Sequence, residues 1–332
     1  MSQASVDGYA TPAVRQSIFD FVRASGLRSV VVGLSKDPNA KVTVLLVSPR
    51  SGRPVLAVKA ATTDPAARAV EAETRVLLGL RARLPRLALA TVPRVVDLVE
   101  FRGRPALVMT AVHGTPMTVS YLSWRHTASP RRVAADFDTV GSWLADLQRG
   151  TAGHDRPLDM DGGVGDLLAR RFAADRAVPA DLARLEEIHG RLREHSTPRT
   201  VVHGDLWLGN VLCTGRRVSG VVDWEAGADP GEPVRDLVRF AHMYALYLGR
   251  RTRWGAGLEL ALAGTGWFPT LFRRFISDGL ARLGAPPARW RDAALAGIAE
   301  VAALTDEEGF ARAHLELFRR VARSQPIRKD TP

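Results

Sequence analysis

Apolar residues in the first 110 positions alternate with polar ones or run in short blocks, a pattern typical of β-strands. Three such runs are SVVVGL (29–34), VTVLLV (42–47) and PVLAVKA (54–60), and turn-rich segments separate them. Two more, RVVDLVEF (94–101) and PALVMT (105–110), follow a break marked by proline. The pattern therefore predicts a five-stranded antiparallel sheet, whose first three strands form a meander.

Two helices are predicted in this part of the chain. Apolar residues at helical spacing span 12–25, and Gly26 follows as a stop signal. The second helix separates the third and fourth strands. Asp64 is its expected N-cap, and Pro65 fits the first helical position.

Beyond HGTPM (113–117), a predicted turn and lobe boundary, the spacing becomes mainly helical. One helix begins at Ser129-Pro130, and others are expected at 181–195, 234–249, 268–283, 288–303 and 305–323. The fold class is therefore α+β with two lobes. We expect a helical extension (1–25), a sheet-rich lobe (26–112), a helical lobe (113–325) and a frayed tail (326–332).

The cysteine content, the lengths of the apolar runs and the net charge restrict the class of protein. The chain has 332 residues, one cysteine (Cys213) and a formal net charge of +11. A single cysteine excludes an intrachain disulfide, and we expect a small buried hydrophobe rather than a reactive thiol. Because no targeting segment or membrane-length apolar run is evident, we expect a cytoplasmic protein without a membrane partner. The scattered arginines indicate a solvated basic surface rather than a nucleic-acid site.

Three oxygen-bearing side chains lie near predicted strand ends. In HGDLWLGN (203–210), Asp205 follows one strand and Asn210 opens the next, while Asp223 ends the strand VSGVVD. The turn TGRR (214–217) makes the last two strands a hairpin, so all three side chains are expected at one rim. Carboxylate and amide oxygens suit Mg²⁺, which also keeps water and phosphate ligands.

Lys59 supplies a cation at the end of the strand LAVK, and it is one of only four lysines. A compact ammonium suits phosphate oxygens, and it needs a carboxylate to hold it. Glu73 shares a helix face with Leu77 and Leu80, so it is expected to point toward the sheet. Glu71 is the competing candidate, although it falls off that face.

The motifs AVK, an acid on the next helix, HGDxxxxN and VVDWE occur in this order. Together they resemble the aminoglycoside phosphotransferase and choline kinase group, whose fold resembles that of protein kinases. The resemblance covers roughly residues 26–250. It implies an enzyme that transfers phosphate from ATP or GTP, with Mg²⁺, to a hydroxyl of a small molecule.

The resemblance also implies a role for each matching residue. Lys59 would contact the α- and β-phosphates, and Glu73 would position it. Asp205 would accept or orient the substrate hydroxyl, and Asn210 and Asp223 would hold Mg²⁺.

Other matching positions would support the nucleotide or the loop. Thr110 and Val112, in the segment that matches the family's hinge, would meet the adenine edge through backbone groups. His203 would brace the loop rather than act as a base, and Asp236 would brace it from a helix start. Lys36 or Lys41 is a candidate for covering the phosphates.

Only twelve residues separate Asp223 from Asp236, so the activation loop of protein kinases is missing. This spacing favours a small-molecule acceptor: a sugar, an aminoglycoside or aminocyclitol, or a related compound. The acid-rich stretches 155–166 and 305–310 are candidates to line its site. HGDLWxGN is similar to the ketosamine kinase variant, although Trp207 is read as a packing residue. A catalytically silent nucleotide-binding protein is the other alternative, and the oligomeric state is left open.

Overall fold

The structure is a computed structural model, and it describes residues 16–34, 39–84, 90–248 and 253–323. The chain divides into two compact units, each described here by itself. The first comprises the chain up to Arg75 together with Arg94–Ala111. The second comprises Val76–Pro93 and everything from Val112 onward. Thr110 therefore belongs to the first unit and Val112 to the second.

The first unit is built on an antiparallel sheet with the strand order β1-β2-β3-β5-β4. Its strands are β1 (Arg28–Leu34), β2 (Lys41–Val47), β3 (Pro54–Ala61), β4 (Val95–Phe101) and β5 (Arg104–Thr110). All five strands are confirmed. The meander holds for the first three, after which the chain crosses over so that β5, rather than β4, pairs with β3. Lys36 lies outside the described residues, and Lys41 is buried at the start of β2.

Helix α1 (Ile18–Ser25) packs on one face of this sheet. Ile18 joins a core with Leu46, Val58 and Val99, so the N-terminal helix shares the sheet's interior. The predicted start at residue 12 lies outside the described residues, and the described helix is capped by the Ser17 hydroxyl, which accepts from the Phe19 N–H. Gly26 ends it with a φ of 65°, as its stop signal predicted.

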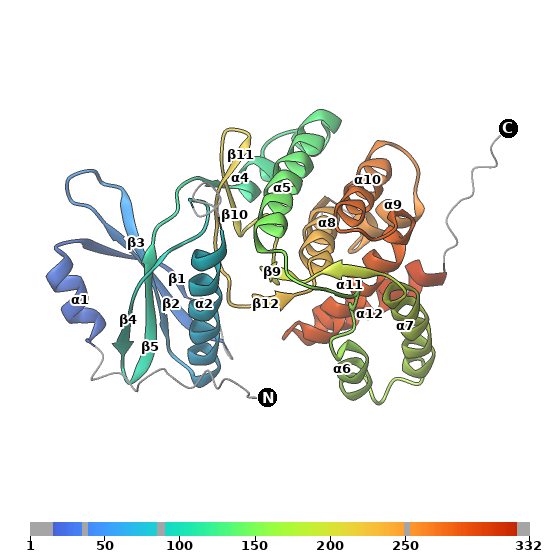
Figure 1. The fold of residues 1–332 in the computed structure, drawn as a ribbon, viewed down its shortest axis with the longest axis horizontal. Coiled ribbons are helices and arrows are strands. Elements are labelled where there is room, and N and C mark those ends of the chain that lie inside the picture. The colour runs from blue at the N-terminus through green and yellow to red at the C-terminus, as the bar shows by residue number, and fades with distance from the viewer. Residues whose placement is uncertain (1–15, 35–38, 85–89, 249–252, 324–332) are drawn as a thin grey trace. The chain divides into compact units, whose positions relative to one another are not determined.

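Helix α2 (Asp64–Arg83) lies on the opposite side of the sheet from α1 (Figure 1). The predicted N-cap is wrong by one residue. The Thr63 hydroxyl, not Asp64, accepts from the backbone N–H of Ala66, three positions into the helix. The aspartate at the first helical position still carries negative charge at the positive end of the helix dipole.

The second unit is mainly helical (Figure 1). Its helices are α4 (Met117–Leu122), α5 (Pro130–Thr151), α6 (Val164–Arg171), α7 (Val178–Arg193), α8 (Val234–Leu248), α9 (Ala256–Ala263), α10 (Trp267–Arg282), η1 (Pro287–Arg289), α11 (Trp290–Leu304) and α12 (Glu308–Arg323). Its strands are β6 (Thr115–Pro116), β7 (Asp155–Pro157), β8 (Ser196–Pro198), β9 (Thr200–Val202), β10 (Val211–Thr214), β11 (Arg217–Val221) and β12 (Ala228–Gly231). The helices predicted from Ser129 onward and the β10–β11 hairpin are confirmed. The helices α4, α6 and α9 and the short strands β6, β7, β8 and β12 were not predicted, whereas β9 is the strand expected before Asp205.

Helices α8 and α11 form the core of the second unit. Most of their side chains are buried, and α11 is rich in alanine. A Cβ added to Gly297 of α11 would lie 2.3 Å from a methyl carbon of Val238 on α8, so only glycine permits this approach. The close packing brings Glu300 of α11 within 3.4 Å of Arg235 of α8.

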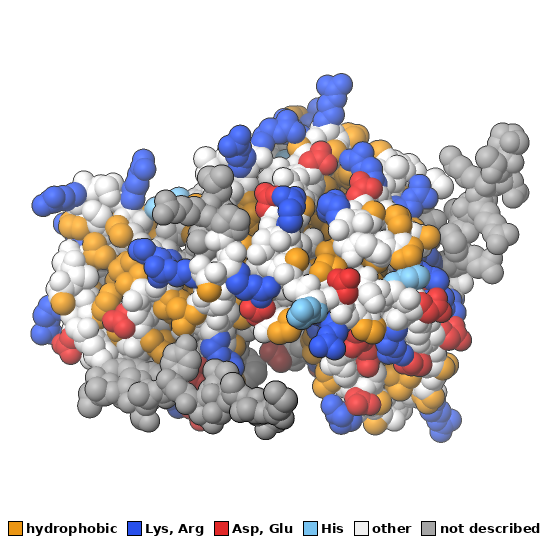
Figure 2. All heavy atoms as spheres, in the orientation of Figure 1, with side chains coloured by type: hydrophobic (Ala, Val, Ile, Leu, Met, Phe, Trp, Pro, Cys, Tyr) orange, Lys and Arg blue, Asp and Glu red, His pale blue; other side chains and the backbone are white. Residues whose placement is uncertain are grey.

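The mixed α+β architecture confirms the predicted fold class. Among the helices that the structure describes, none combines the length and the apolar character needed to cross a bilayer. Figure 2 shows Lys and Arg side chains spread over the visible face among Asp and Glu, not gathered into one stripe.

Candidate active site

The loop after β9 is fixed through its backbone by the first turn of α8. Asp236 is fully buried, and its two carboxylate oxygens accept the N–H groups of His203 (2.6 Å) and Gly204 (2.8 Å). Burial raises the pKa of Asp236, while the neighbouring His203 and these two N–H donors oppose the rise. Gly204 has a φ of 79°, and an added Cβ would lie 2.1 Å from the Ala226 carbonyl oxygen. The expected bracing contact of Asp236 is therefore present.

His203 lies inside the loop as a brace. Its side chain is completely buried, its Nδ1 accepts the Asp205 N–H at 3.2 Å, and its Nε2 lies 2.9 Å from the Val222 carbonyl oxygen. With Nδ1 as an acceptor, Nε2 carries the proton and donates to Val222. These contacts match the structural role expected for His203.

Asp205 and Asn210 are joined directly. The Asn210 Nδ2 group donates to the backbone oxygen of Asp205 at 3.0 Å and lies 3.4 Å from Asp205 Oδ2. Because the amide nitrogen is engaged in this way, the Asn210 side-chain oxygen points away from Asp205. That oxygen is a hard donor of the kind that a divalent cation accepts.

The β10–β11 hairpin brings the third oxygen-bearing residue to Asn210. The Val222 N–H donates to the main-chain carbonyl oxygen of Asn210 at 3.0 Å. Asp223 is therefore the residue next to one that is hydrogen-bonded to Asn210. Asp223 lies two residues beyond the end of β11 and has a φ of 72°, uncommon for a residue other than glycine. Such outliers persist where the surroundings hold them, often at functional sites. The structure thus brings Asp205, Asn210 and Asp223 together at one rim.

This donor set fits a magnesium ion bound together with a nucleotide. One amide and one carboxylate are typical protein ligands for Mg²⁺, which takes its other ligands from phosphates and water. Within the described ranges, no group of three His, Cys, Asp or Glu side chains has the arrangement of a self-contained metal site.

Lys59 and Glu73 form a buried ion pair in the first unit. The Lys59 Nζ lies 2.8 Å from both Glu73 carboxylate oxygens, and the two side chains are 10% and 1% exposed. Val58 and Ala60 face the α1 core, so the alternation of β3 turns Lys59 to the opposite face, toward α2. Glu71 is exposed. The predicted partner, Glu73 rather than Glu71, is confirmed as the residue that holds Lys59.

The hinge candidates lie at the end of β5 and just beyond it. The Thr110 N–H donates to the Arg94 carbonyl oxygen, and the Arg94 N–H returns a bond to the Thr110 hydroxyl, both at 2.9 Å. In a regular antiparallel pair the Arg94 N–H would donate to the Thr110 main-chain carbonyl oxygen. Here it donates to the Thr110 side-chain hydroxyl instead. Val112 lies beside Gly220 of β11, where an added Cβ would be 2.7 Å from a Val112 methyl carbon.

A hollow of about 330 Å³ opens beside Asp205 in the second unit. Its charged lining consists of Asp205, Glu225, Arg235, Arg239, Glu300 and Asp306. Burial raises the pKa of Glu300, and the charge of Arg235 opposes that rise. With four acids and two arginines, the hollow does not share the net positive charge of the whole chain.

The two acid-rich stretches reach this region through one acidic residue each. Asp306, from the stretch 305–310, lines the hollow beside Asp205. Asp159, from the stretch 155–166, lines a neighbouring hollow of about 310 Å³ that shares Gly204, Arg235 and Glu300 with the first. Glu308 instead pairs with Arg171 on the surface.

Arg239 is the residue that the motif search missed. Its Nε and Nη2 atoms lie 3.0 and 2.6 Å from Oδ1 of Asp205. The signal was present in the spacing, since Arg239 follows Asp236 by three positions and so lies on the same side of α8.

Trp207 packs within the loop, as predicted. Its ring would lie 2.4 Å from a Cβ added to Gly209, and it stacks on Tyr247 at 5.9 Å between ring centroids. Cys213 is half-buried on β10. Burial, and to a lesser extent Asp136, raises the pKa of its thiol to about 11, so it remains protonated and unreactive at neutral pH.

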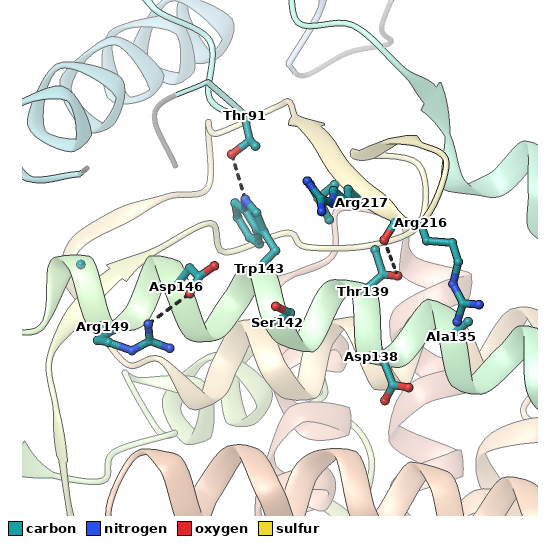
Figure 3. Close-up of a pocket in the computed structure, with 12 residues that line it drawn as sticks. Thr91, Ala135, Asp138, Thr139, Ser142, Trp143, Asp146, Arg149, Arg216 and Arg217 are labelled. Carbon is teal, nitrogen blue, oxygen red and sulfur yellow. Dashed lines mark hydrogen bonds and ion pairs between the residues drawn. The ribbon is translucent and has the colours of Figure 1, made fainter. Parts of the chain in front are cut away.

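A hollow of about 960 Å³ lies away from these residues, between α5 and the β10–β11 hairpin (Figure 3). The Trp143 indole N–H points to the Thr91 hydroxyl at 2.9 Å on one side of it, and Thr139 bonds the Arg216 carbonyl oxygen on the other. Its described lining contains none of the residues proposed from the motifs.

Comparisons with known proteins agree on one fold. Aminoglycoside phosphotransferase APH(4)-Ia, as a thermostable mutant in its apo form, is 16% identical, with a TM-score of 0.58 over 91% of this chain and 97% of its own. A further variant of that enzyme, in a ternary complex with ADP and hygromycin B, is 15% identical, with a TM-score of 0.56 over 92% and 97%. Macrolide 2'-phosphotransferase MphH from Brachybacterium faecium is 19% identical, with a TM-score of 0.53 over 90% and 95%.

These likenesses show the protein-kinase-like fold that the motifs implied. No curated protein matches the chain in sequence. A sequence model described as "Phosphotransferase enzyme family" matches residues 39–272, which span both compact units and every motif discussed above. The chain therefore belongs to the phosphotransferase enzyme family.

Proposed function

We propose that the protein is a kinase that uses ATP and Mg²⁺ to phosphorylate a hydroxyl group of a small molecule. The observation that carries this proposal is the bonded set of Asp205, Asn210 and Val222–Asp223, which puts a candidate base beside two candidate metal ligands. The buried Lys59–Glu73 pair supports it, since a Lys so held suits α- and β-phosphate oxygens.

Each residue is proposed to act as follows. Lys59, positioned by Glu73, contacts the α- and β-phosphates. The backbone groups of Thr110 and Val112 meet the adenine edge. Asn210 and Asp223 hold the magnesium ion, which neutralises charge on the phosphates when bound.

The proposed transfer is an in-line displacement. The acceptor hydroxyl oxygen forms a bond to the γ-phosphorus, the bond to the β–γ bridging oxygen breaks, and ADP leaves. Asp205 orients the hydroxyl and accepts its proton, which then passes to solvent.

The acceptor is proposed to bind in the charged hollow beside Asp205. A lining with both carboxylates and guanidinium groups suits a polar, polyhydroxylated compound such as a sugar, an aminocyclitol or a related natural product. Two of the solved structures with this fold are named as aminoglycoside and macrolide phosphotransferases, which supports an acceptor of this size and polarity.

The test is a screen with Mg-ATP, in which ADP formation is followed with aminoglycosides, ketosamines, macrolides, nucleosides and choline-like alcohols. Asp205→Asn should lower turnover by about 10²- to 10⁴-fold, the usual contribution of an acid–base group, while ATP binding persists. Turnover of that variant equal to that of the wild type would refute the proposal. ATP binding without transfer to any acceptor would favour a silent nucleotide-binding protein instead.

A further inference from the structure

Arg239 makes a specific contact with the candidate base. Two of its N–H groups converge on a single oxygen of Asp205, Oδ1, at 3.0 and 2.6 Å. The other oxygen, Oδ2, has a longer contact of 3.4 Å with Asn210 Nδ2. The carboxylate is thus held at one oxygen by a charged fork, which fixes the direction of the other.

The position of Arg239 on α8 reinforces this arrangement. Asp236, three residues earlier, holds the backbone N–H groups of His203 and Gly204. One side of α8 therefore holds the loop's main chain through Asp236 and its reactive side chain through Arg239.

Stability alone does not account for the pair. The side chains of Arg239 and Asp205 are 26% and 32% exposed, and ion pairs that solvent reaches in this way contribute little to folding stability. Helix α8 is already anchored by a large buried face that includes Leu237, Phe240 and Tyr244. Both members of the pair also line the hollow proposed for the acceptor.

We propose that Arg239 is a positioning residue that engages Oδ1 of Asp205 and thereby presents Oδ2 to the acceptor hydroxyl. This inference rests on the proposed function. A guanidinium suits the role because its planar fork gives two donors in fixed geometry, whereas a lysine gives a single compact charge.

The experiment measures phosphate release from Mg-ATP, with water as the acceptor, for the wild type and for Arg239→Gln, Arg239→Lys, Arg239→Ala and Asp205→Asn. Arg239→Gln should lower kcat about 10- to 100-fold, since a misplacement of roughly 1 Å costs about that much, and should leave the KM for ATP within about twofold. The kcat of Arg239→Lys should lie between the kcat of Arg239→Gln and that of the wild type. Methylguanidine added to Arg239→Ala should restore part of the lost kcat.

Arg191→Gln is the matched control. Arg191 on α7 also gives two N–H groups to a carboxylate, that of Asp292 on α11, at 3.1 and 2.6 Å and with similar exposure (33% and 15%). Neither residue lines the hollow beside Asp205. Arg191→Gln should change kcat less than twofold, and added methylguanidine should not change the kcat of this variant. Thermal unfolding confirms that each variant is folded.

The outcomes separate this inference from the proposed function. If Asp205→Asn lowers phosphate release but Arg239→Gln stays within twofold of the wild type in kcat, the positioning role is refuted and the proposed function stands. A change in the KM for ATP without a change in kcat also refutes it. If Asp205→Asn releases phosphate as fast as the wild type, the proposed function fails first, and this inference fails with it.

Discussion

Two buried histidines, on α8 and α12, make the second unit sensitive to acid. His242 and His314 are 2% and 0% exposed, and their Nε2 atoms lie 3.1 Å apart. His314 Nδ1 donates to the Phe310 carbonyl oxygen, so its Nε2 accepts the proton of His242. The contact between the two rings therefore holds one proton, and a second proton at Nε2 of His314 would break it. A proton added at Nδ1 of His242, a buried atom with no hydrogen-bond partner among the described residues, would place an unpaired charge in the core.

The direction and size of the acid effect follow from the pKa values. Burial lowers the pKa of His314 to about 4 and that of His242 well below its usual 6.5. Because the unfolded chain binds protons below about pH 6.5 and the folded chain does not, stability is lost as the pH falls from about 6.5 toward 4. For His314 alone, with about 1.36 kcal/mol per pKa unit, the loss between neutral pH and pH 5 is about 2 kcal/mol.

Urea unfolding followed by tryptophan fluorescence measures this effect. All seven tryptophans lie in the second unit, and Trp254 packs on His314 at 4.9 Å between ring centroids. The free energy of unfolding is compared at pH 7.5 and pH 5 for the wild type and for the double variant His242→Leu/His314→Leu. The wild type should lose about 2 kcal/mol more than the double variant, or a larger amount if His242 adds its own share.

Carboxylates elsewhere contribute equally to the loss of stability at pH 5 in the wild type and in the double variant. Only the difference between the two losses in unfolding free energy therefore reports on the histidine pair. His154→Gln, at an exposed position, controls for the loss of a histidine and should retain the wild-type loss. Equal losses in the wild type and the double variant would refute the account of the pair.

Two further predictions concern the candidate site. Glu73→Gln leaves Lys59 buried beside a neutral amide, and we expect it to destabilise the protein by about 1–3 kcal/mol and to raise the KM for ATP, as measured by unfolding and by steady-state kinetics. Gly204→Ala places a Cβ 2.1 Å from the Ala226 carbonyl oxygen at a φ of 79°, so we expect it to abolish turnover and lower the unfolding temperature by several degrees.

The chain offers a control for each of these two substitutions. Glu71→Gln removes an exposed carboxylate from the same helix as Glu73 and should leave the KM unchanged. Gly190→Ala adds a methyl group within α7, where no atom lies within 4 Å, and should be neutral or slightly stabilising. Wild-type behaviour of Glu73→Gln or Gly204→Ala would contradict the contacts assigned to those residues.

The longer elements were predictable because a buried face leaves a period in the sequence. The alternation in β3 turns Val58 to the α1 core and Lys59 to α2, and helical spacing put Glu73 on the inward face of α2. The side-chain partner of Lys59 could therefore be identified from the pattern alone.

Very short strands and helices that are apolar on nearly all sides show no such periodic pattern in the sequence. β6, β7 and β8 have two or three residues each, too few to show alternation. α9 is apolar around its axis except at Glu259, so its sequence shows no distinct apolar face. The cap of α2 shifted by one residue because threonine and aspartate stand side by side, and either is a good N-cap.

The spacing from Asp236 puts Arg239 on the same side of α8, but the contact with Asp205 could not be predicted from that alone because it depends on where α8 lies. Along α8, Asp236 and His242 lie three positions from Arg239 on either side, and Asp205 lies across from it. Its charge also helps to lower the pKa values of His242 and His314. One line of positions on α8 thus holds the loop backbone, holds the proposed base and helps to keep the buried histidines neutral.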